Sequence, residues 1–273
     1  MITFFRRRGL GNTSCREMAR IINEELGGEA RVVRNDNVSI DDGDVVVRWG
    51  CTSTIPANVT VINSARAIHN CNDKARSRLA LQANGIPVPR TYARVEDVIG
   101  LTGTFVARPE THSQGKRMVV GGAQHVISAF NGWGSGYISE YIHKVREVRV
   151  FIAQGRVVWV AEKTPADPTA HAWNVAQGGR FDNVRWSEWP IKACVAAIEA
   201  CRLLGADFAG VDVMLDADNN PYILELNSAP SQTSPYRQMC SAKAFMWMYE
   251  NGKEPLPHDD SNWKSMIHPA LRA

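Results

Sequence analysis

The sequence predicts an α/β fold, and three features carry this prediction. The first third alternates short apolar strands with a helical segment, which is the pattern of a small parallel α/β unit. The segment Pro190–Leu204 repeats apolar side chains on one helical face and ends at Gly205. The remaining strands come mostly as neighbouring pairs, so this part of the chain has α+β character.

Each element follows from its local pattern and its turn residues. In the first third we expect strands at 2–6, 30–34, 44–49 and 59–63, and a helix at 14–26 that two glycines end. Beyond it we expect a helix at 72–84, strands at 104–108, 118–120 and 137–142, a hairpin of 147–153 with 157–161, and the helix 190–204. Residues 132–136 are read as a loop, and the tail from 254 onward as irregular.

The apolar runs VDVML and YILELN raise a question, because each holds a carboxylate where alternation favours a side chain that packs. In a hairpin with Leu215 opposite Tyr222, Asp212 falls opposite Glu225. Like charges directly across an antiparallel pair are destabilising, so either a positive group lies between them or one carboxyl stays protonated. Asn227 emerges from the same face as Glu225.

Two carboxylates and an amide oxygen suit a hard cation such as Mg²⁺, with nucleotide phosphates completing its coordination. The alternative is an edge hairpin with two solvated acids. The turn itself does not fit an EF-hand loop, because its sixth position is Pro221 and its twelfth is Asn227. The hairpin is therefore the candidate metal site.

The composition is that of an ordinary globular protein, with 44% hydrophobic and 22% charged residues. The net charge of +3 is too small to indicate a nucleic-acid partner. No apolar run approaches the ~20 residues of a membrane span, and no signal peptide is recognisable. The six cysteines lack CxxC or zinc spacing, which favours a reducing, cytoplasmic location.

The chain has no GxxxxGK[ST] motif, which excludes a P-loop. Two other loops are candidates for binding the phosphates of a nucleotide. The loop 111–117 offers backbone N–H groups and an ammonium to a polyphosphate, with Arg108 at the end of the preceding strand. An ordinary polar turn is the alternative. The loop 9–14 nearly matches the dinucleotide fingerprint, and an ordinary strand-to-helix turn is again the alternative. The candidates in the first loop are Ser113, Gln114, Gly115 and Lys116.

Four stretches, taken in order, resemble the ATP-grasp carboxylate–amine ligases, the superfamily of D-alanine–D-alanine ligase and the ribosomal-protein glutamate ligase RimK. The hairpin VDVMLDADNNPYILELNSAPSQTS resembles that family's metal-binding end. NDKARSRLALQANGIPVPRTY resembles its opening helix, FVARPETHSQGKRMVV its phosphate-covering strand and glycine loop, and YISEYIHKVREVRVFIAQGRVV its adenine hinge and ribose strand. The resemblance implies an ATP-grasp fold with a Rossmann-like N-terminal lobe.

The resemblance also implies roles for the matched residues. Lys74 and Arg108 would hold ATP phosphates, with Arg108 standing where the family usually has lysine. Asp212, Glu225 and Asn227 would bind Mg²⁺, or Mn²⁺ as the alternative ion. The adenine hinge would consist of Glu140, Tyr141 and Ile142, and Glu147 would bind the ribose. The transferred phosphoryl group or the acyl phosphate would be held by Arg149, Lys163 and Asn174.

Two departures from the family pattern bear on the substrate. The D-alanine ligases have an arginine two residues before the metal aspartate, where this chain has Gly210, and a glycine where it has Ser231. The stretch AWNVAQGGRF resembles the RimK side of the superfamily more closely. These departures argue against D-alanine and favour an amino-acid or peptide-type ligase.

The activity that the resemblance implies is ATP-dependent amide formation through an acyl phosphate. The partners would be a small-molecule or peptide carboxylate and an amine. The alternatives are an ATP-grasp kinase acting on a hydroxyl, a non-catalytic ATP-binding module and, more distantly, an oxidoreductase built on the loop 9–14.

We expect three regions: an N-terminal α/β lobe at 1–70, a small lid subdomain at 71–140 and a large subdomain at 141–273 with the metal site. Exposed cations at Arg6, Arg7 and Arg8, facing the acceptor cleft, would favour an acidic substrate. A homo-oligomer is compatible with the sequence, which does not fix the oligomeric state.

Overall fold

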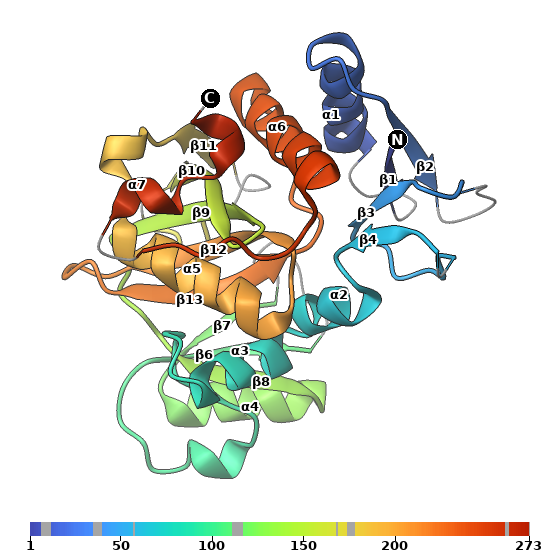
Figure 1. Cartoon of the computed structure of the whole chain (residues 1–273). Helices are drawn as coiled ribbons and strands as arrows, with labels where there is room; N and C mark the ends of the chain where they lie inside the picture. Colours follow the sequence, from blue (N-terminus) through green and yellow to red (C-terminus); the bar gives the residue numbers. More distant parts are fainter. Residues whose placement is uncertain are drawn as a thin grey trace.

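The computed structural model describes residues 1–6, 12–34, 40–56, 58–110, 117–167, 169–173, 178–259 and 262–272. Their strands form three sheets, one near the N-terminus, one in the middle of the chain and one that dominates the second half (Figure 1). Helices cover these sheets, so the predicted mixed α/β class is confirmed.

The N-terminal sheet is parallel throughout, as the alternation of strands with a helix predicts. Its order is β2-β1-β3-β4. All five residues of β1 and of β3 are buried, as expected for central strands covered on both faces. The elements are β1 (Ile2–Arg6), α1 (Asn12–Glu24), β2 (Ala30–Arg34), β3 (Val45–Trp49) and β4 (Thr60–Ile62).

The expected exposed cationic cluster at the end of β1 is wrong for Arg6, whose side chain is buried. Arg7 and Arg8 lie outside the described residues. So do Gly9 and Gly11 of the loop that resembles the dinucleotide fingerprint.

The helix predicted at 72–84 is confirmed as the second of two consecutive helices, and the sequence did not predict the first. The two helices are α2 (Ala65–Asn72) and α3 (Lys74–Ala83), and Asp73 separates them in an extended conformation. The Asp73 side chain accepts the N–H of Arg76 at 3.0 Å and so caps α3, while Ser64 caps α2 through the N–H of Ala67. The break sets the direction of α3, which brings Lys74 to the cavity described below.

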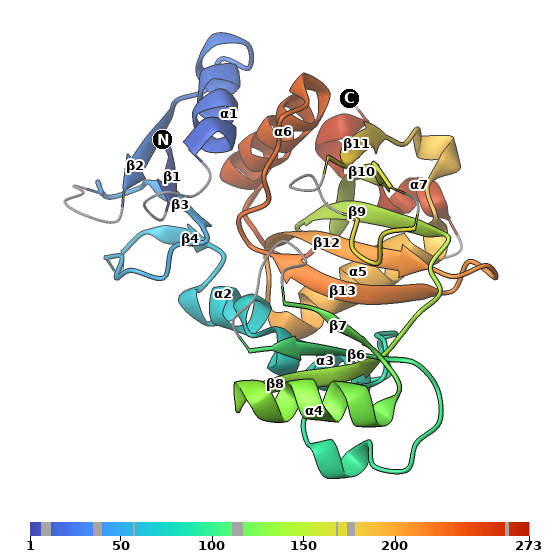
Figure 2. The ribbon, with the colours of Figure 1, turned by 180° about the vertical axis from the view of Figure 1, so that it is seen from behind.

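The middle sheet is antiparallel, with the order β5-β8-β6-β7. Its strands are β5 (Thr91–Tyr92), β6 (Phe105–Pro109), β7 (Val119–Gly121) and β8 (Gly136–Glu140), and a short helix η1 (Val95–Asp97) precedes β6. The helix α4 (Ala123–Trp133) covers one face (Figure 2). The loop expected at 132–136 is therefore only partly correct, because Gly132 and Trp133 end α4 and Gly134 caps it with a φ of 75°.

The largest sheet has five antiparallel strands in the order β11-β10-β9-β12-β13. Its members are β9 (Arg146–Ala153), β10 (Arg156–Thr164), β11 (Arg180–Asn183), β12 (Phe208–Leu215) and β13 (Pro221–Asn227). Between β11 and β12 lie η3 (Trp186–Glu188) and α5 (Ile191–Leu204), the helix whose apolar face the sequence predicts.

The two faces of this sheet have different partners. One face, with residues such as Val150 and Val211, packs against α5, which lies in front of the sheet in Figure 1 and behind it in Figure 2. The other face packs Phe151 and Trp159 against the helix α6 (Pro235–Asn251), which also contacts α1. Further along the same strands this second face becomes polar, and there the candidate site lies.

The hairpin of β12 and β13 has the expected pair of carboxylates but a different register. Leu215 lies opposite Pro221 rather than Tyr222. A β-bulge then leaves Leu224 as an extra residue, and this restores Asp212 to its place opposite Glu225. The predicted pairing of Asp212 with Glu225 is therefore correct, because the one-residue shift at the turn is compensated by the one-residue bulge at Leu224.

The tail is more ordered than the sequence indicates, with α7 (Trp263–Met266) and η4 (Pro269–Leu271). The six cysteines are buried free thiols, which agrees with the absence of zinc spacing. In the described part of the chain, none of the helices combines the length and the apolar character that crossing a bilayer requires.

Candidate active site

A cavity of about 490 Å³ lies between the middle sheet and the polar face of the five-stranded sheet. Eleven of the residues singled out from the sequence line it: Lys74, Arg108, Glu140, Tyr141, Ile142, Glu147, Arg149, Lys163, Asp212, Glu225 and Asn227. The other five, Ser113, Gln114, Gly115, Lys116 and Asn174, lie outside the described residues.

One row of residues crosses the five-stranded sheet on the cavity side. Strand pairing places Glu225 opposite Asp212, Asp212 opposite Arg149, Arg149 opposite Ala161, and Ala161 opposite Asn183. Residues paired directly across neighbouring strands present their side chains on the same face. The row therefore brings two acidic groups and one basic group from three adjacent strands to one surface.

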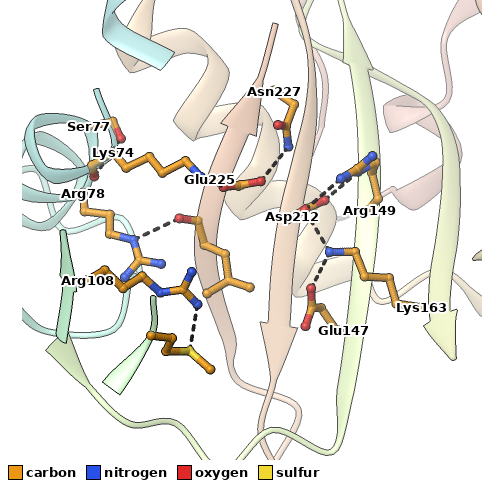
Figure 3. A network of polar contacts seen from close by, with 12 residues as sticks. Lys74, Ser77, Arg78, Arg108, Glu147, Arg149, Lys163, Asp212, Glu225 and Asn227 are labelled. Atoms are coloured by element: carbon orange, nitrogen blue, oxygen red, sulfur yellow. Dashed lines mark hydrogen bonds and ion pairs between the residues drawn. The ribbon is translucent and has the colours of Figure 1, made fainter. Parts of the chain in front are cut away.

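Asp212 lies in the middle of a buried ion network (Figure 3). Arg149 donates to its carboxylate through Nε at 2.6 Å and Nη2 at 2.9 Å. Lys163 donates to the same carboxylate at 2.9 Å and also to Glu147, which pairs with Lys144 as well. The network explains why a carboxylate can lie at this position of an apolar strand. Arg149 and Lys163 lie beside Asp212 and compensate its charge.

These partners set the protonation states. Burial on its own would raise the pKa of Asp212, but the Arg149 guanidinium and the Lys163 ammonium outweigh it and hold that pKa well below its usual range. Burial would likewise lower the pKa of Lys163, and the carboxylates of Asp212 and Glu147 reverse the effect and raise it. Lys144 differs, because burial prevails and lowers its pKa.

Glu225 has a partner from another element. Lys74, the first residue of α3, lies 2.6 Å from Oε2 of Glu225. Burial and the neighbouring Asp212 charge would raise the pKa of Glu225, yet Lys74 lowers it below the usual value. The side-chain amide of Asn227 donates to Oε1 of Glu225 at 3.2 Å. Both carboxylates of the hairpin are therefore ionised.

The donor set fits an oxygen-seeking divalent ion. Asp212, Glu225 and Asn227 offer two carboxylates and an amide oxygen on one face of one hairpin. Within the described ranges, no group of three or more His, Cys, Asp or Glu side chains is arranged to hold a metal by itself. The hairpin thus supplies part of a coordination shell that suits Mg²⁺ when phosphate oxygens complete it.

A second cationic group lines the opposite wall. Arg108 on β6 contacts the sulfur of Met118 at 3.1 Å, and burial lowers its pKa. Arg78 on α3 donates to the carbonyl of Leu224 at 2.9 Å and so satisfies the residue that the β-bulge inserts. With Lys74, whose ammonium reaches Glu225, these arginines form a basic wall on the side of the hairpin opposite Arg149 and Lys163 (Figure 3).

The model of the RimK-like ATP-grasp domain matches residues 71–243 of this chain. The chain belongs to the RimK-like ATP-grasp family. The family and the ATP-grasp fold that the four sequence stretches predict are therefore confirmed.

Individual relatives agree with this ATP-grasp assignment. A probable alpha-L-glutamate ligase of Aeromonas salmonicida is 30% identical over 187 residues, which are 63% of this chain and 61% of that protein. The chain thus matches about three-fifths of the length of this curated relative. The structure of the ATP-grasp ligase PsnB complexed with precursor peptide PsnA2 and AMPPNP superposes with a TM-score of 0.65 at 14% identity, over 92% of this chain and 98% of that chain.

The D-alanine–D-alanine ligase from Bacillus anthracis superposes with a TM-score of 0.62 at 15% identity. The superposition covers 99% of this chain and 97% of the ligase. At such identities the two superpositions establish the shared ATP-grasp fold and nothing finer.

This ATP-grasp chain has a close approach where D-alanine ligases carry an arginine. A Cβ on Gly210 would lie 2.8 Å from the Cβ of Pro230 and 3.4 Å from the Cδ of Arg149. Glycine therefore lets the loop after β13 approach β12 and leaves room for Arg149 beside Asp212.

At the end of β8 the expected hinge residues line the cavity beside aromatic rings. The hydroxyl of Tyr141 lies 2.9 Å from Nδ1 of His171, and the ammonium of Lys144 lies 4.5 Å from the centre of the Trp173 ring. Tyr92 donates to the carboxylate of Glu140 at 3.3 Å. These contacts form a mixed polar and aromatic wall next to Glu147.

Sequence reasoning missed several cavity residues. Arg78 lies one helical turn after Lys74 and Lys144 three residues before Glu147, so spacing from a recognised residue was the available signal. No local signal marked Arg237, which comes from α6 and reaches the cavity only through the tertiary fold.

Proposed function

We propose that this chain is an ATP-dependent carboxylate–amine ligase that forms an amide bond through an acyl phosphate, with ATP converted to ADP and phosphate. One observation carries the proposal: the donors Asp212, Glu225 and Asn227 and the cations of two facing walls line a single cavity in an ATP-grasp chain. A triphosphate needs both kinds of group, since metal ions and cations neutralise the charge on its oxygens.

The cavity residues divide into two roles. Lys74 and Arg108 would bind phosphate oxygens, and Glu140, Tyr141, Ile142 and Glu147 would hold the adenosine part at the end of β8. Asp212, Glu225 and Asn227 would bind Mg²⁺, which on binding supplies charge neutralisation for the phosphates. Because Lys74 and Lys163 contact the carboxylates in this structure, they would shift from carboxylate to phosphate oxygens when nucleotide binds.

The chemistry on the substrate side needs cations and no covalent nucleophile. The substrate carboxylate attacks the γ-phosphorus, the bond to the β-phosphate oxygen breaks, and ADP leaves. The amine nitrogen then attacks the acyl carbon, loses a proton, and phosphate departs. Arg149 and Lys163 would stabilise the charge on the transferred group. Their position in the cavity beside Asp212 supports this role.

The reactants are proposed as a small-molecule or peptide carboxylate and an amine. Two of the similar proteins support amino-acid and peptide chemistry, since one is a probable alpha-L-glutamate ligase and the other is a ligase in complex with a precursor peptide.

The experiment is ATP turnover with pooled amino acids and short peptides in Mg²⁺, with products identified by mass spectrometry. A product lighter by one water than the sum of its two parts, formed with stoichiometric ADP, supports ligation. A product heavier by one phosphoryl group would make the protein a kinase. Tight Mg·ATP binding without turnover across the pool would favour a non-catalytic module.

A further inference from the structure

Arg237 is a buried cation that lines the cavity and has no place in the nucleotide-binding roles above. It lies in the first turn of α6 and is 6% exposed. Its Nη1 donates to Oδ1 of Asn183 at 2.9 Å and to the carbonyl of Phe181 at 3.5 Å. The guanidinium lies 5.7 Å from the centre of the Trp159 ring and 5.8 Å from that of Phe181.

Within the described ranges, Arg237 forms no ion pair with a carboxylate, whereas Arg149 and Lys163 both pair with Asp212. The nearby carboxylate of Asp182 accepts from Thr164 and Arg180 instead. Burial lowers the pKa of Arg237, and the positive charge of Arg149 adds to this effect. The charge of Asp182 offsets these effects only in part, since the pKa of Arg237 remains lowered. A buried guanidinium without an ion-pair partner costs free energy, which an anion in the cavity would relieve.

The position of Arg237 separates it from the phosphate-binding wall. Its partner Asn183 ends the row that runs from Glu225 through Asp212 and Arg149. Four strand steps of about 4.8 Å put roughly 19 Å between the ends of that row. Lys74 lies at the Glu225 end, and Arg237 lies at the other, beyond Arg149.

We propose that Arg237 binds a substrate carboxylate that does not react, so that each productive substrate pair includes a free carboxylate in addition to the activated one. This inference rests on the proposed ligase function. The reacting carboxylate lies beside Arg149, and a group extending from it away from the metal-type donors reaches Arg237. The specificity of the site is then for acidic reactants.

The surroundings of Arg237 favour a carboxylate there. A guanidinium binds a carboxylate through two parallel N–H donors, and the rings of Trp159 and Phe181 restrict its orientation. The lining of the same cavity also includes the hydroxyl groups of Ser231 and Thr233. The carboxylate has two sources, namely a second acidic group on the activated substrate or the carboxylate of an amino acid that supplies the amine.

The test compares wild type, Arg237→Gln and Arg237→Lys, with Arg202→Gln as the control because Arg202 is an exposed arginine on α5. The pool contains monocarboxylic and dicarboxylic acids, amino acids, the monoamide of each dicarboxylic acid, which keeps the carboxylate to be activated, and the carboxamide of each amino acid, which keeps its amine. Turnover of the acids and of these amides is measured by ADP release and product mass. Replacing a dicarboxylic activated substrate by its monoamide, and separately the amine-supplying amino acid by its carboxamide, distinguishes the two sources.

We expect wild type to prefer the acid over the matched amide, and Arg237→Gln to lose about tenfold or more in kcat/KM for the acid, since a hydrogen bond to a charged group contributes about 1.5–3 kcal/mol. Its kcat/KM for the amide should change little, so the preference disappears. Arg237→Lys should retain part of the preference for the acid. Affinity for Mg·ADP should stay within about twofold of wild type.

Equal use of acid and amide by wild type would overturn the inference while leaving the ligase function intact. The inference would also be overturned if Arg237→Gln lost as much affinity for Mg·ADP as Arg108→Gln does, since Arg237 would then bind phosphate. If no product forms, the ligase proposal fails, and thermal unfolding with Mg·ADP and the same acids still decides the inference. Stabilisation of wild type but not Arg237→Gln by acids supports it, and no acid-dependent stabilisation overturns it.

Discussion

Asp212 and Arg149 lie opposite each other on β12 and β9 and are joined by two hydrogen bonds of 2.6 and 2.9 Å. Both side chains are largely buried. The pair connects the proposed metal donors to the cations on the substrate side of the cavity. Changes to this pair should therefore affect both the stability of the free protein and its proposed chemistry.

Removing either partner of this pair should destabilise the protein. Asp212→Asn leaves Arg149 without a carboxylate and Lys163 with Glu147 alone, and Arg149→Gln leaves Asp212 with Lys163 alone. Each change should lower the free energy of unfolding by about 3 kcal/mol. Urea unfolding in the presence of a chelator measures this loss. In the double variant the two losses should differ from additivity by at least about 1 kcal/mol. Strictly additive losses would contradict the pairing.

Glu225→Gln should abolish ATP turnover, because the change keeps the shape of the side chain but removes the charge of a proposed metal ligand. We expect kcat to fall by at least about 100-fold, in the range seen when groups that stabilise transition-state charge are removed. Asp218→Asn, in the exposed turn of the same hairpin, is the control and should retain wild-type activity. Near-normal ATP consumption by Glu225→Gln would contradict the metal assignment.

Gly210→Ala should be costly for a steric reason. The new Cβ would lie 2.8 Å from the Cβ of Pro230, so the loop after β13 must move. We expect a loss of about 1–3 kcal/mol in unfolding free energy, together with reduced activity. Gly132→Ala is the matched control, because its Cβ meets nothing within 4 Å and helix α4 favours alanine. A neutral Gly210→Ala would show that the loop adapts freely.

His268 should make stability depend on pH. Burial, with Arg156 and Arg272 nearby, lowers its pKa from 6.5 to about 4. The folded state therefore favours the neutral imidazole, so its contribution is present above pH 6.5 and is lost as the pH falls towards 4. The loss should total about 3 kcal/mol, since each pKa unit corresponds to about 1.4 kcal/mol.

Urea unfolding of wild type and His268→Gln between pH 7.5 and pH 4 would measure this dependence. We expect the variant to show a shallower decline, while His69→Gln, an exposed residue of α2, should follow wild type. Parallel curves for wild type and His268→Gln would contradict the assignment.

The sequence predicts those parts of the site that local pattern defines. Asp212 and Glu225 stand out because they interrupt apolar alternation, and Lys74 follows from its place in the opening helix. The register of their hairpin was wrong at the turn, since nothing local distinguishes the bulge at Leu224 from a regular strand. The carbonyl of Leu224 accepts from Arg78, which approaches from another element.

The helix α6 was missed for a related reason. Its buried residues include Arg237, Gln238 and Ser241 alongside apolar ones, so the helix lacks a clear apolar stripe in the sequence. These polar residues are buried because α6 lies between the N-terminal sheet and the five-stranded sheet. Only the tertiary arrangement shows that Arg237 reaches the cavity.

The measurement that tests the central proposal most directly follows the oxygen atoms. The pooled acids are labelled with heavy oxygen in their carboxylates and supplied with ATP, Mg²⁺ and amines. Activation through an acyl phosphate transfers one labelled oxygen to each phosphate released, in proportion to ADP and amide formed. Unlabelled phosphate released alongside an amide product, or phosphate retained on the product, would contradict the proposed mechanism.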